Sequence, residues 1–379
     1  MQMTGPDTAY EGARITRPLE TELNPSDMTG RQPGAIPCQI RILRALGLVM
    51  CHTLGVMSKL SALRRRVEPL LPIRSLEWAL RLAMLRPPLR GALNRTYNTL
   101  GWRQKRYFWH LFGAAFVNHS SVFAGDWKIV FNDRSIVLPL TAGRLWLDWL
   151  LAVSLLGHDA EVKQTYMSIL KSKRRPDLFV DVGANYGQNS ILFLVHGIRT
   201  ISFEPNPACH DYFAETARLN QVSPDIRSLA VGDAHYPLQI IFAEGQTWNG
   251  SADPDMQERL RATFADQLRN LSVEQTTLDD VLASQTAERM LIKIDTEGFE
   301  AQVFRGARKV MASRKATIIF EAWPEPSART PLYEILAHER YSVFALPWDA
   351  KSGRALSRDA FETAVGMNFL ALPAELAPS

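Results

Sequence analysis

The feature that most constrains this 379-residue chain is an alternation of short apolar segments with amphipathic helical segments from Asp177 onward. The expected strands are 178–182, 200–203, 226–231, 290–294, 316–320, 341–345 and 368–372. Strands that alternate with helices form mostly parallel sheets, so the pattern predicts an α/β fold with a seven-stranded, doubly wound, Rossmann-like sheet. Segment 245–272 breaks the alternation and predicts an insertion between the third and fourth strands.

Composition and periodicity divide the chain into four segments. We expect a disordered segment at 1–37, a helical accessory region at 38–120, a hairpin and helix leading into the core at 121–176, and the main domain at 177–379. The first segment is polar and interrupted by prolines, which opposes regular structure. In the third, Asn132 and Asp133 predict a hairpin turn, and 145–171 predicts one helical run.

The aromatic residues of the accessory region bear on the partner class. Several lie between Tyr97 and Phe116, beside Arg103 and Arg106, a combination that suits base stacking in nucleic-acid-binding proteins. Their helical spacing favours a protein core instead. Together with a formal net charge of only +4, this predicts no nucleic-acid partner.

The N-terminal sequence and the cysteines bear on location. The apolar stretch Ala45–Met57 has 13 residues, fewer than the roughly 20 that span a bilayer. We expect a helix of the accessory region there; the alternative is peripheral membrane contact through residues 40–66. Cys38, Cys51 and Cys209 are odd in number and lack metal-site spacing, so a cytoplasmic location is expected, with membrane association left open.

The strongest local signal is the segment Phe179–Asn189, FVDVGANYGQN. An apolar strand reaches Asp181, turns through Gly183 and Gly187, and enters a helix. Glycine suits positions where the backbone takes positive φ or approaches a ligand closely. In open α/β sheets, ligands bind outside the carboxyl ends of the strands, so this loop predicts a ligand site.

The same loop distinguishes between two adenosine-containing ligands. Dinucleotide-binding folds carry GxGxxG here, whereas this chain has Gly183-Ala-Asn-Tyr-Gly187. Asn185 would crowd a pyrophosphate, and Asp181 would repel it. A carboxylate suits S-adenosylmethionine (SAM), which carries an ammonium and a sulfonium. SAM is therefore the expected cofactor, and an NAD-dependent oxidoreductase is the alternative.

Acidic residues also end the second and third expected strands. Glu204 lies in ISFEPNP, 21 residues after Gly183, where a carboxylate can accept from both ribose hydroxyls. Asp233 lies in AVGD; it either accepts from the adenine amine or forms a simple Gly-Asp turn.

The segment LIKIDTEGFE places Asp295 and Glu297 at the end of the fourth strand, and these are the candidate catalytic residues. Asp295 could deprotonate a substrate hydroxyl or hold the methionine end of SAM. It could instead bind a divalent metal together with Glu297 and Glu321, which follows the fifth strand. Lys293 either neutralises this acidic patch or has a partner inside the sheet.

Six motifs between about 177 and 325 together resemble the FkbM family of SAM-dependent methyltransferases. They are FVDVGANYGQNS, ISFEPNP, SLAVGD, TTLDDVL, LIKIDTEGFEAQVFRGA and IIFEAW. The resemblance implies O-methylation of a hydroxyl on a sugar, glycan or natural product. It also implies a residue for each part of the donor: Asp181, Gly183, Asn185 and Gly187 around the methionine part, Glu204 at the ribose, and Asp295 beside the transferred methyl.

The acceptor is expected to be a small molecule or a glycan. The inserted residues Trp248, Asn249 and Gly250 are candidates to shape its pocket. A non-catalytic scaffold that binds a partner through residues 38–118 is the remaining alternative, and the strand-end carboxylates argue against it. The oligomeric state stays open.

Overall fold

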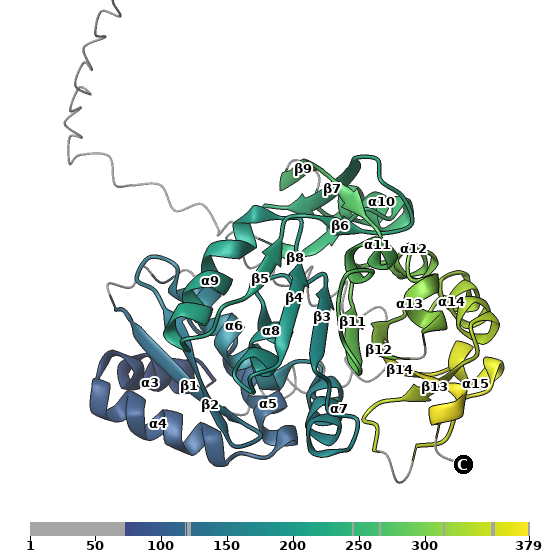
Figure 1. Cartoon of the computed structure of the whole chain (residues 1–379). Helices are drawn as coiled ribbons and strands as arrows, with labels where there is room; N and C mark the ends of the chain where they lie inside the picture. Colours follow the sequence, from purple (N-terminus) through teal and green to yellow (C-terminus); the bar gives the residue numbers. More distant parts are fainter. Residues whose placement is uncertain are drawn as a thin grey trace, which may run out of the picture. The chain divides into compact units, whose positions relative to one another are not determined.

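The computed structural model describes residues 73–117, 119, 123–244, 246–264, 267–313, 315–349 and 353–377 (Figure 1). The expectations for 1–37 and for 40–66, and those that concern Cys38 and Cys51, lie outside these described residues. No helix in the described ranges is both long and apolar enough to cross a membrane.

The part before the main domain is helical with one hairpin. It contains α3 (Ile73–Leu85), α4 (Pro87–Thr99), α5 (Trp102–Phe112), β1 (Gly125–Phe131), β2 (Arg134–Leu140), α6 (Leu145–Gly157) and α7 (Ala160–Lys171). Asn132 and Asp133 have φ values of 45° and 69°, the left-handed pair that a tight hairpin turn requires. The predicted run over 145–171 is two helices, because Asp159 takes a left-handed conformation (φ 42°) and interrupts it.

Seven strands form the large sheet in the order β13-β14-β12-β11-β3-β4-β5. They are β3 (Leu178–Val182), β4 (Arg199–Phe203), β5 (Asp225–Arg227), β11 (Met290–Ile294), β12 (Ala316–Glu321), β13 (Tyr341–Ala345) and β14 (Asn368–Pro373). The strands from β5 to β12 are parallel, and β14 runs antiparallel to both neighbours. This confirms the predicted fold class. The chain moves outward from β3 to β5 and then returns to β11, so the order reverses between β3 and β11.

The prediction of one third strand over 226–231 is wrong in one respect, because two separate strands lie in this segment. Arg227 pairs with Phe203, the last residue of β4, so the residues after Arg227 have no partner in the large sheet. They form β6 (Ala230–Val231), which pairs with β10 (Gln275–Thr276) in a separate two-stranded sheet.

The insertion is a small antiparallel sheet rather than an irregular loop. It contains β7 (Leu238–Ala243), β8 (Gln246–Ser251), α10 (Pro254–Phe264) and β9 (Leu268–Val273), in the strand order β8-β7-β9. Figure 1 shows these elements above β3, β4 and β11. The insertion therefore begins about seven residues before the predicted 245.

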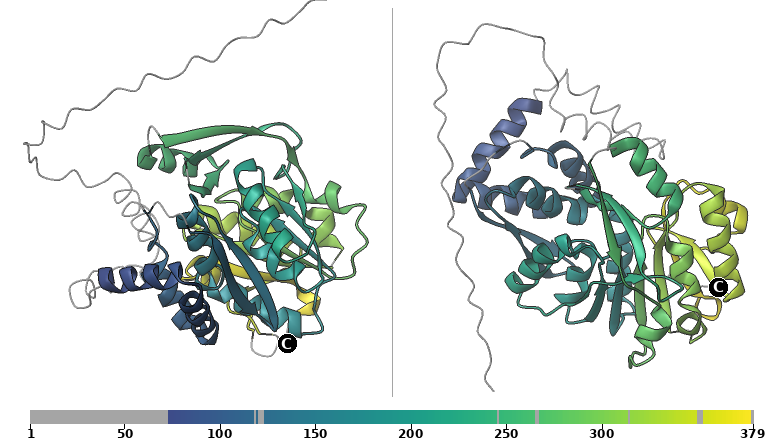
Figure 2. Two further views of the ribbon diagram at one scale, coloured as in Figure 1. Left: turned by 90° about the vertical axis from the view of Figure 1, so that its left-hand side faces the viewer. Right: turned by 90° about the horizontal axis from the view of Figure 1, so that it is seen from above.

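Helices cover both faces of the large sheet (Figure 2). One face packs on α6, α7 and α8 (Gln188–Leu194) through side chains such as Phe179 and Leu291. The other packs on α12 (Glu300–Arg305), α13 (Arg308–Ala312) and α14 (Pro326–His338) through Val180 and Ile292. The remaining helices are α9 (His210–Leu219), α11 (Leu278–Leu282) and α15 (Arg358–Glu362).

Alternation along the strands also gives one face a polar end. Residues two apart in a strand share a face, so Asp181 lies on the face of Phe179, and Lys293 on that of Leu291. Asp181 and Lys293 are directly opposite each other in the β3–β11 pairing. This is the face that α7 covers, so charged side chains of the sheet lie beneath that helix.

An aromatic cluster holds the N-terminal helices against the hairpin. The ring of Trp149 makes edge contacts with Phe108, Phe116 and Trp127 at centroid distances of 6.1, 5.5 and 5.2 Å. Its indole nitrogen donates to the carbonyl of Phe112 at 2.7 Å. These aromatic side chains form core, as their helical spacing predicted.

Trp149→Ala is expected to lower the free energy of unfolding by about 3–5 kcal/mol, because it leaves a large cavity in this cluster. Urea denaturation measures the change. The matched control is Trp78→Ala, since Trp78 is 61% exposed on α3 and its loss should cost less than about 0.5 kcal/mol. Equal effects for the two variants would contradict the assignment of the cluster as core.

Candidate active site

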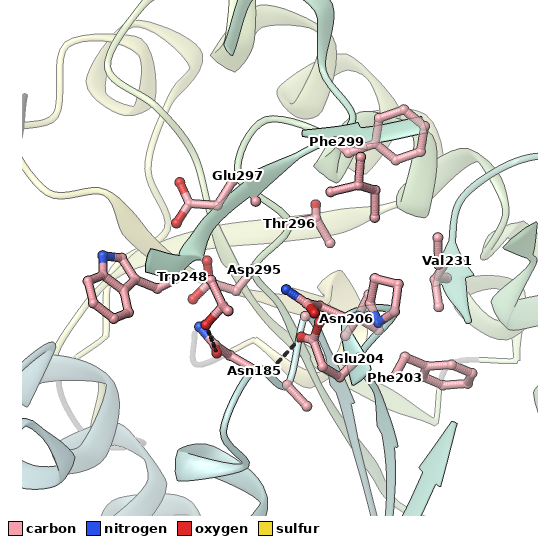
Figure 3. A pocket seen from close by; sticks show the side chains of 18 of the residues that line it. Asn185, Phe203, Glu204, Asn206, Val231, Trp248, Asp295, Thr296, Glu297 and Phe299 are labelled. Carbon is pink, nitrogen blue, oxygen red and sulfur yellow. Dashed lines mark hydrogen bonds between the residues drawn. The ribbon is translucent and has the colours of Figure 1, made fainter. Parts of the chain in front are cut away.

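A cavity lies where β3, β4 and β11 end, at the position where the strand order reverses. Its walls come from the loops after these strands, from β7 and β8, and from the junction of α6 and α7. Figure 3 shows Val231 and Phe299 at one end, Glu204 and Asp295 in the middle, and Glu297 at the other end. Open α/β sheets bind their ligands at such a reversal point, which makes this cavity the candidate site.

The glycines of the β3 loop are required by the packing of the protein itself. Gly183 has φ 80°, and a Cβ there would lie 1.8 Å from the carbonyl oxygen of Asp295. Gly187 has φ 73°, and its Cβ would lie 2.2 Å from the ring of Phe213. Gly183 lines the cavity, whereas Gly187 is not among the lining residues. The loop therefore packs directly against the loop that carries Asp295.

Asn185 lies between these glycines and lines the cavity. It takes a left-handed conformation with φ 48°. Its side-chain oxygen accepts hydrogen bonds from Thr247 at 3.4 Å and from Cys209 at 3.2 Å. Thr247 belongs to β8, so Asn185 joins the β3 loop to the inserted sheet.

Asp181 was expected beside the methionine part of SAM, but it lies deeper in the protein than such a contact requires. It is fully buried inside β3, and it is not among the residues that line the cavity. Its Oδ2 accepts a hydrogen bond from Ser190 at 2.6 Å, and burial raises its pKa to about 6. The reason is its strand position, because its side chain points toward α7 and the strand ends one residue later. Asp181 therefore underlies the site and does not form its surface.

Glu204 lines the cavity and joins two loops. One carboxylate oxygen accepts from the backbone N–H of Asn185 at 2.7 Å, and the other from that of Asn206 at 2.8 Å. Burial raises the pKa of Glu204 to about 7, although both backbone N–H groups act in the opposite direction. The side chain is thus held at the cavity wall by the backbone of the β3 and β4 loops.

Asp233 does not reach the cavity. It is exposed, and it accepts a hydrogen bond from Arg305 at 2.8 Å. The AVGD motif had two interpretations. Because Asp233 is not among the residues that line the cavity, its position does not favour the contact with adenine. The residues at this end of the cavity are apolar instead, and they include Phe203, Leu229 and Phe299.

The predicted carboxylates after β11 and β12 do come together. Carboxylate oxygens of Asp295, Glu297 and Glu321 lie within 4.8 Å of one another, an arrangement that could hold a metal ion. Lys293 donates to Asp295 Oδ2 at 3.0 Å, so it both pairs with a carboxylate and sits inside the sheet. Burial and the nearby charge of Asp295 raise the pKa values of Glu297 and Glu321.

Glu300 shapes the loop that carries these groups, a role that the sequence reasoning missed. Its Oε1 accepts from the backbone N–H and the hydroxyl of Thr296, both at 2.9 Å, and from the N–H of Gly298 at 3.3 Å. The DTEGFE motif thus contains a carboxylate that folds the loop in addition to those that face the cavity.

Three lining residues at the α6–α7 junction were also missed: His158, Asp159 and Lys163. An acidic residue directly before a helix is a start signal, and Asp159 could have revealed the break in the predicted run over 145–171. From the insertion, Trp248 and Gly250 line the cavity.

Comparison with known proteins identifies the domain. Residues 181–341 match the family model described as "Methyltransferase FkbM domain", which confirms the predicted resemblance. The chain is similar to "Methyltransferase sdnD" of Sordaria araneosa, with 25% identity over 186 residues that cover 42% of this chain and 71% of that protein.

Two solved structures show weaker similarity. A methyltransferase FkbM from Methylobacillus flagellatus KT has 15% identity and a TM-score of 0.34, and the match covers 61% of this chain and 55% of that one. A precorrin-6y C5,15-methyltransferase from Geobacter metallireducens GS-15 has 10% identity and a TM-score of 0.29, covering 56% and 85% of the two chains.

The raised pKa of Glu204 predicts a pH dependence of stability. Its ordinary value is 4.5 and its folded value about 7, so the folded state holds the proton more tightly. The resulting stabilisation is full below pH 4.5 and is lost as the pH rises through 7. Relative to Glu204→Gln, the wild-type free energy of unfolding should therefore fall by about 1 kcal/mol per pH unit between pH 5 and 7. Urea denaturation of both proteins across this range measures it, and parallel curves would contradict the burial of the carboxyl group.

Proposed function

We propose that this chain is a SAM-dependent methyltransferase that methylates a hydroxyl oxygen of a sugar, glycan or natural product. The observation that carries the proposal is the cavity at the strand reversal, which runs from an apolar end to a group of carboxylates inside an FkbM domain. The similar protein from Sordaria araneosa is itself named a methyltransferase. A cytoplasmic location belongs to the same proposal.

The order of groups along the cavity suits the parts of SAM. The apolar end at Phe203 and Phe299 suits adenine. Glu204 comes next; each of its oxygens accepts one backbone hydrogen bond and retains capacity to accept from a ribose hydroxyl. Asp295 and Glu297 follow, and the negative charge of Asp295 favours the positive sulfonium there.

The proposed reaction is an in-line displacement. The acceptor oxygen attacks the methyl carbon of SAM, the carbon–sulfur bond breaks, and its electron pair stays on sulfur to give a neutral thioether. Asp295 accepts the proton of the hydroxyl, and Lys293 orients it by holding Oδ2. Most of the rate enhancement in such a transfer comes from holding the two reactants in line. Glu297 is the second candidate catalytic group, and Trp248 and Gly250 face the acceptor.

An NAD-dependent oxidoreductase fits this site less well. The position of the middle glycine in GxGxxG belongs here to Asn185, whose side chain is bonded to Thr247 and Cys209. The carboxylate of Asp295 in the lining would repel a pyrophosphate. A non-catalytic scaffold would leave the buried Lys293–Asp295 pair without a chemical role.

Isothermal titration calorimetry should show binding of SAM and of its product S-adenosylhomocysteine, and no binding of NAD⁺. Asp295→Asn should retain donor binding within about threefold but lower methyl transfer by about 100-fold or more, because general base catalysis contributes this much. Transfer is measured with radiolabelled SAM and a panel of glycans and hydroxylated metabolites. Binding of NAD⁺ without SAM would refute the donor, and full activity of Asp295→Asn would refute the base.

A divalent metal at Asp295, Glu297 and Glu321 is a separate question that chelation answers. We propose that the ammonium of Lys293 supplies the positive charge these carboxylates need, since it already pairs with Asp295 and also interacts with Glu321. Methyl transfer should then survive treatment with EDTA. Loss of activity that magnesium or manganese restores would instead establish a metal at the three carboxylates.

A further inference from the structure

Lys163 is a buried lysine whose side-chain ammonium has no direct hydrogen-bond or ion-pair partner among the residues that the structure describes. It lies on α7, it is 5% exposed, and it lines the cavity. Its ammonium makes no hydrogen bond or ion pair with any residue in the described part of the chain, whereas the ammonium of the buried Lys293 pairs with Asp295. An ammonium without a direct partner is costly to bury, so an anionic group of a ligand beside Lys163 would be favoured in this cavity.

Asp159 accompanies Lys163 at the start of the same helix. It also lines the cavity, four residues earlier in the chain, so one turn of α7 presents one charge of each sign. Burial acts to raise the pKa of Asp159, but the charges of His158 and Lys163 outweigh it and lower the value. Of the described residues that line the cavity, Lys163 is the single lysine or arginine, while four are acidic.

Their electrostatic neighbours locate the pair along the cavity. Lys163 interacts with Lys293 and Asp295, and Asp159 interacts with Lys293. The charged group that acts on Glu204 is Asp181 instead. The two residues therefore lie toward the Asp295 end, beyond the part of the cavity that suits adenine and ribose.

We propose that Lys163 and Asp159 bind the amino-acid end of the methyl donor, with Lys163 donating to its α-carboxylate and Asp159 accepting from its α-ammonium. The inference rests on the proposed function, and it assigns a subsite outside the matched domain of 181–341. A zwitterionic amino acid next to the sulfonium matches, in charge, one cation and one anion at the Asp295 end of the cavity. It would also remove the cost of the unpaired ammonium.

Donor analogues that lack one group each can test this assignment. Decarboxylated SAM lacks the carboxylate, and 5′-(3-carboxypropylthio)-5′-deoxyadenosine lacks the ammonium of S-adenosylhomocysteine. 5′-Methylthioadenosine lacks both groups but keeps the adenosine. Calorimetry with the full chain should show that the wild type prefers SAM over decarboxylated SAM by about 10–100-fold, the range of a hydrogen bond between charged groups.

In Lys163→Met, SAM affinity should fall by about 10–100-fold while the affinity for decarboxylated SAM stays within about threefold, so that the preference disappears. Asp159→Asn should lose the corresponding preference for S-adenosylhomocysteine over its deaminated analogue. Lys171→Met is the matched control, since Lys171 is an exposed lysine at the end of the same helix, and it should behave as the wild type.

Binding of 5′-methylthioadenosine separates the possible failures. If Lys163→Met and Asp159→Asn still bind it as the wild type does, their cavities are folded and their lost preferences support the subsite. If Lys163→Met still prefers SAM over decarboxylated SAM, the assignment is overturned. This holds even if the variant has changed its affinity for the acceptor. Should Lys163→Met fail to fold, Lys163→Gln provides the same comparison. A wild type that binds neither SAM nor 5′-methylthioadenosine would refute the proposed function itself.

Discussion

The pairing of the buried Lys293 with Asp295 at the cavity wall is the interaction on which the site depends. A lysine inside a parallel strand is costly to desolvate, and this cost is offset only if a carboxylate meets it with good geometry. The 3.0 Å contact meets this requirement and fixes Asp295 at the end of β11. Asp181 on β3 lies opposite Lys293, so the two central strands share one charged layer beneath α7.

The rest of the site is arranged around this layer by close backbone packing. The β3 loop lies against the carbonyl of Asp295, where a side chain at position 183 has no room. Glu204 ties that loop to the β4 loop through two backbone N–H groups. Because each loop is held by its neighbour, the cavity wall is fixed by the chain itself, which suits a reaction that depends on positioning.

The sequence predicted those parts of the molecule that local pattern controls. The bounds of β3 and β11 were predicted without error, since both are short, mostly apolar and fully buried runs flanked by loop residues. Asp295, Glu297 and Glu204 were placed at the cavity because residues after parallel strands meet at one edge. Asp181 and Asp233 were misplaced, because strand periodicity and an ion pair with Arg305 decide their directions. The contribution of α7 could not be predicted, since it depends on a helix break and on packing across the sheet.

The position of α7 bears on what counts as the smallest working unit of this protein. The recognisable domain begins at 181, yet the helix that covers the charged layer ends ten residues earlier, at Lys171. Tyr166 of that helix packs edge-on against Phe179 and Phe193, which belong to the sheet and to α8. A polypeptide trimmed to the family boundary would keep most of the diagnostic motifs but would lose the start of β3 and open the layer of Asp181 and Lys293 to water. For this protein, the limits of sequence homology are narrower than the limits of the functional module.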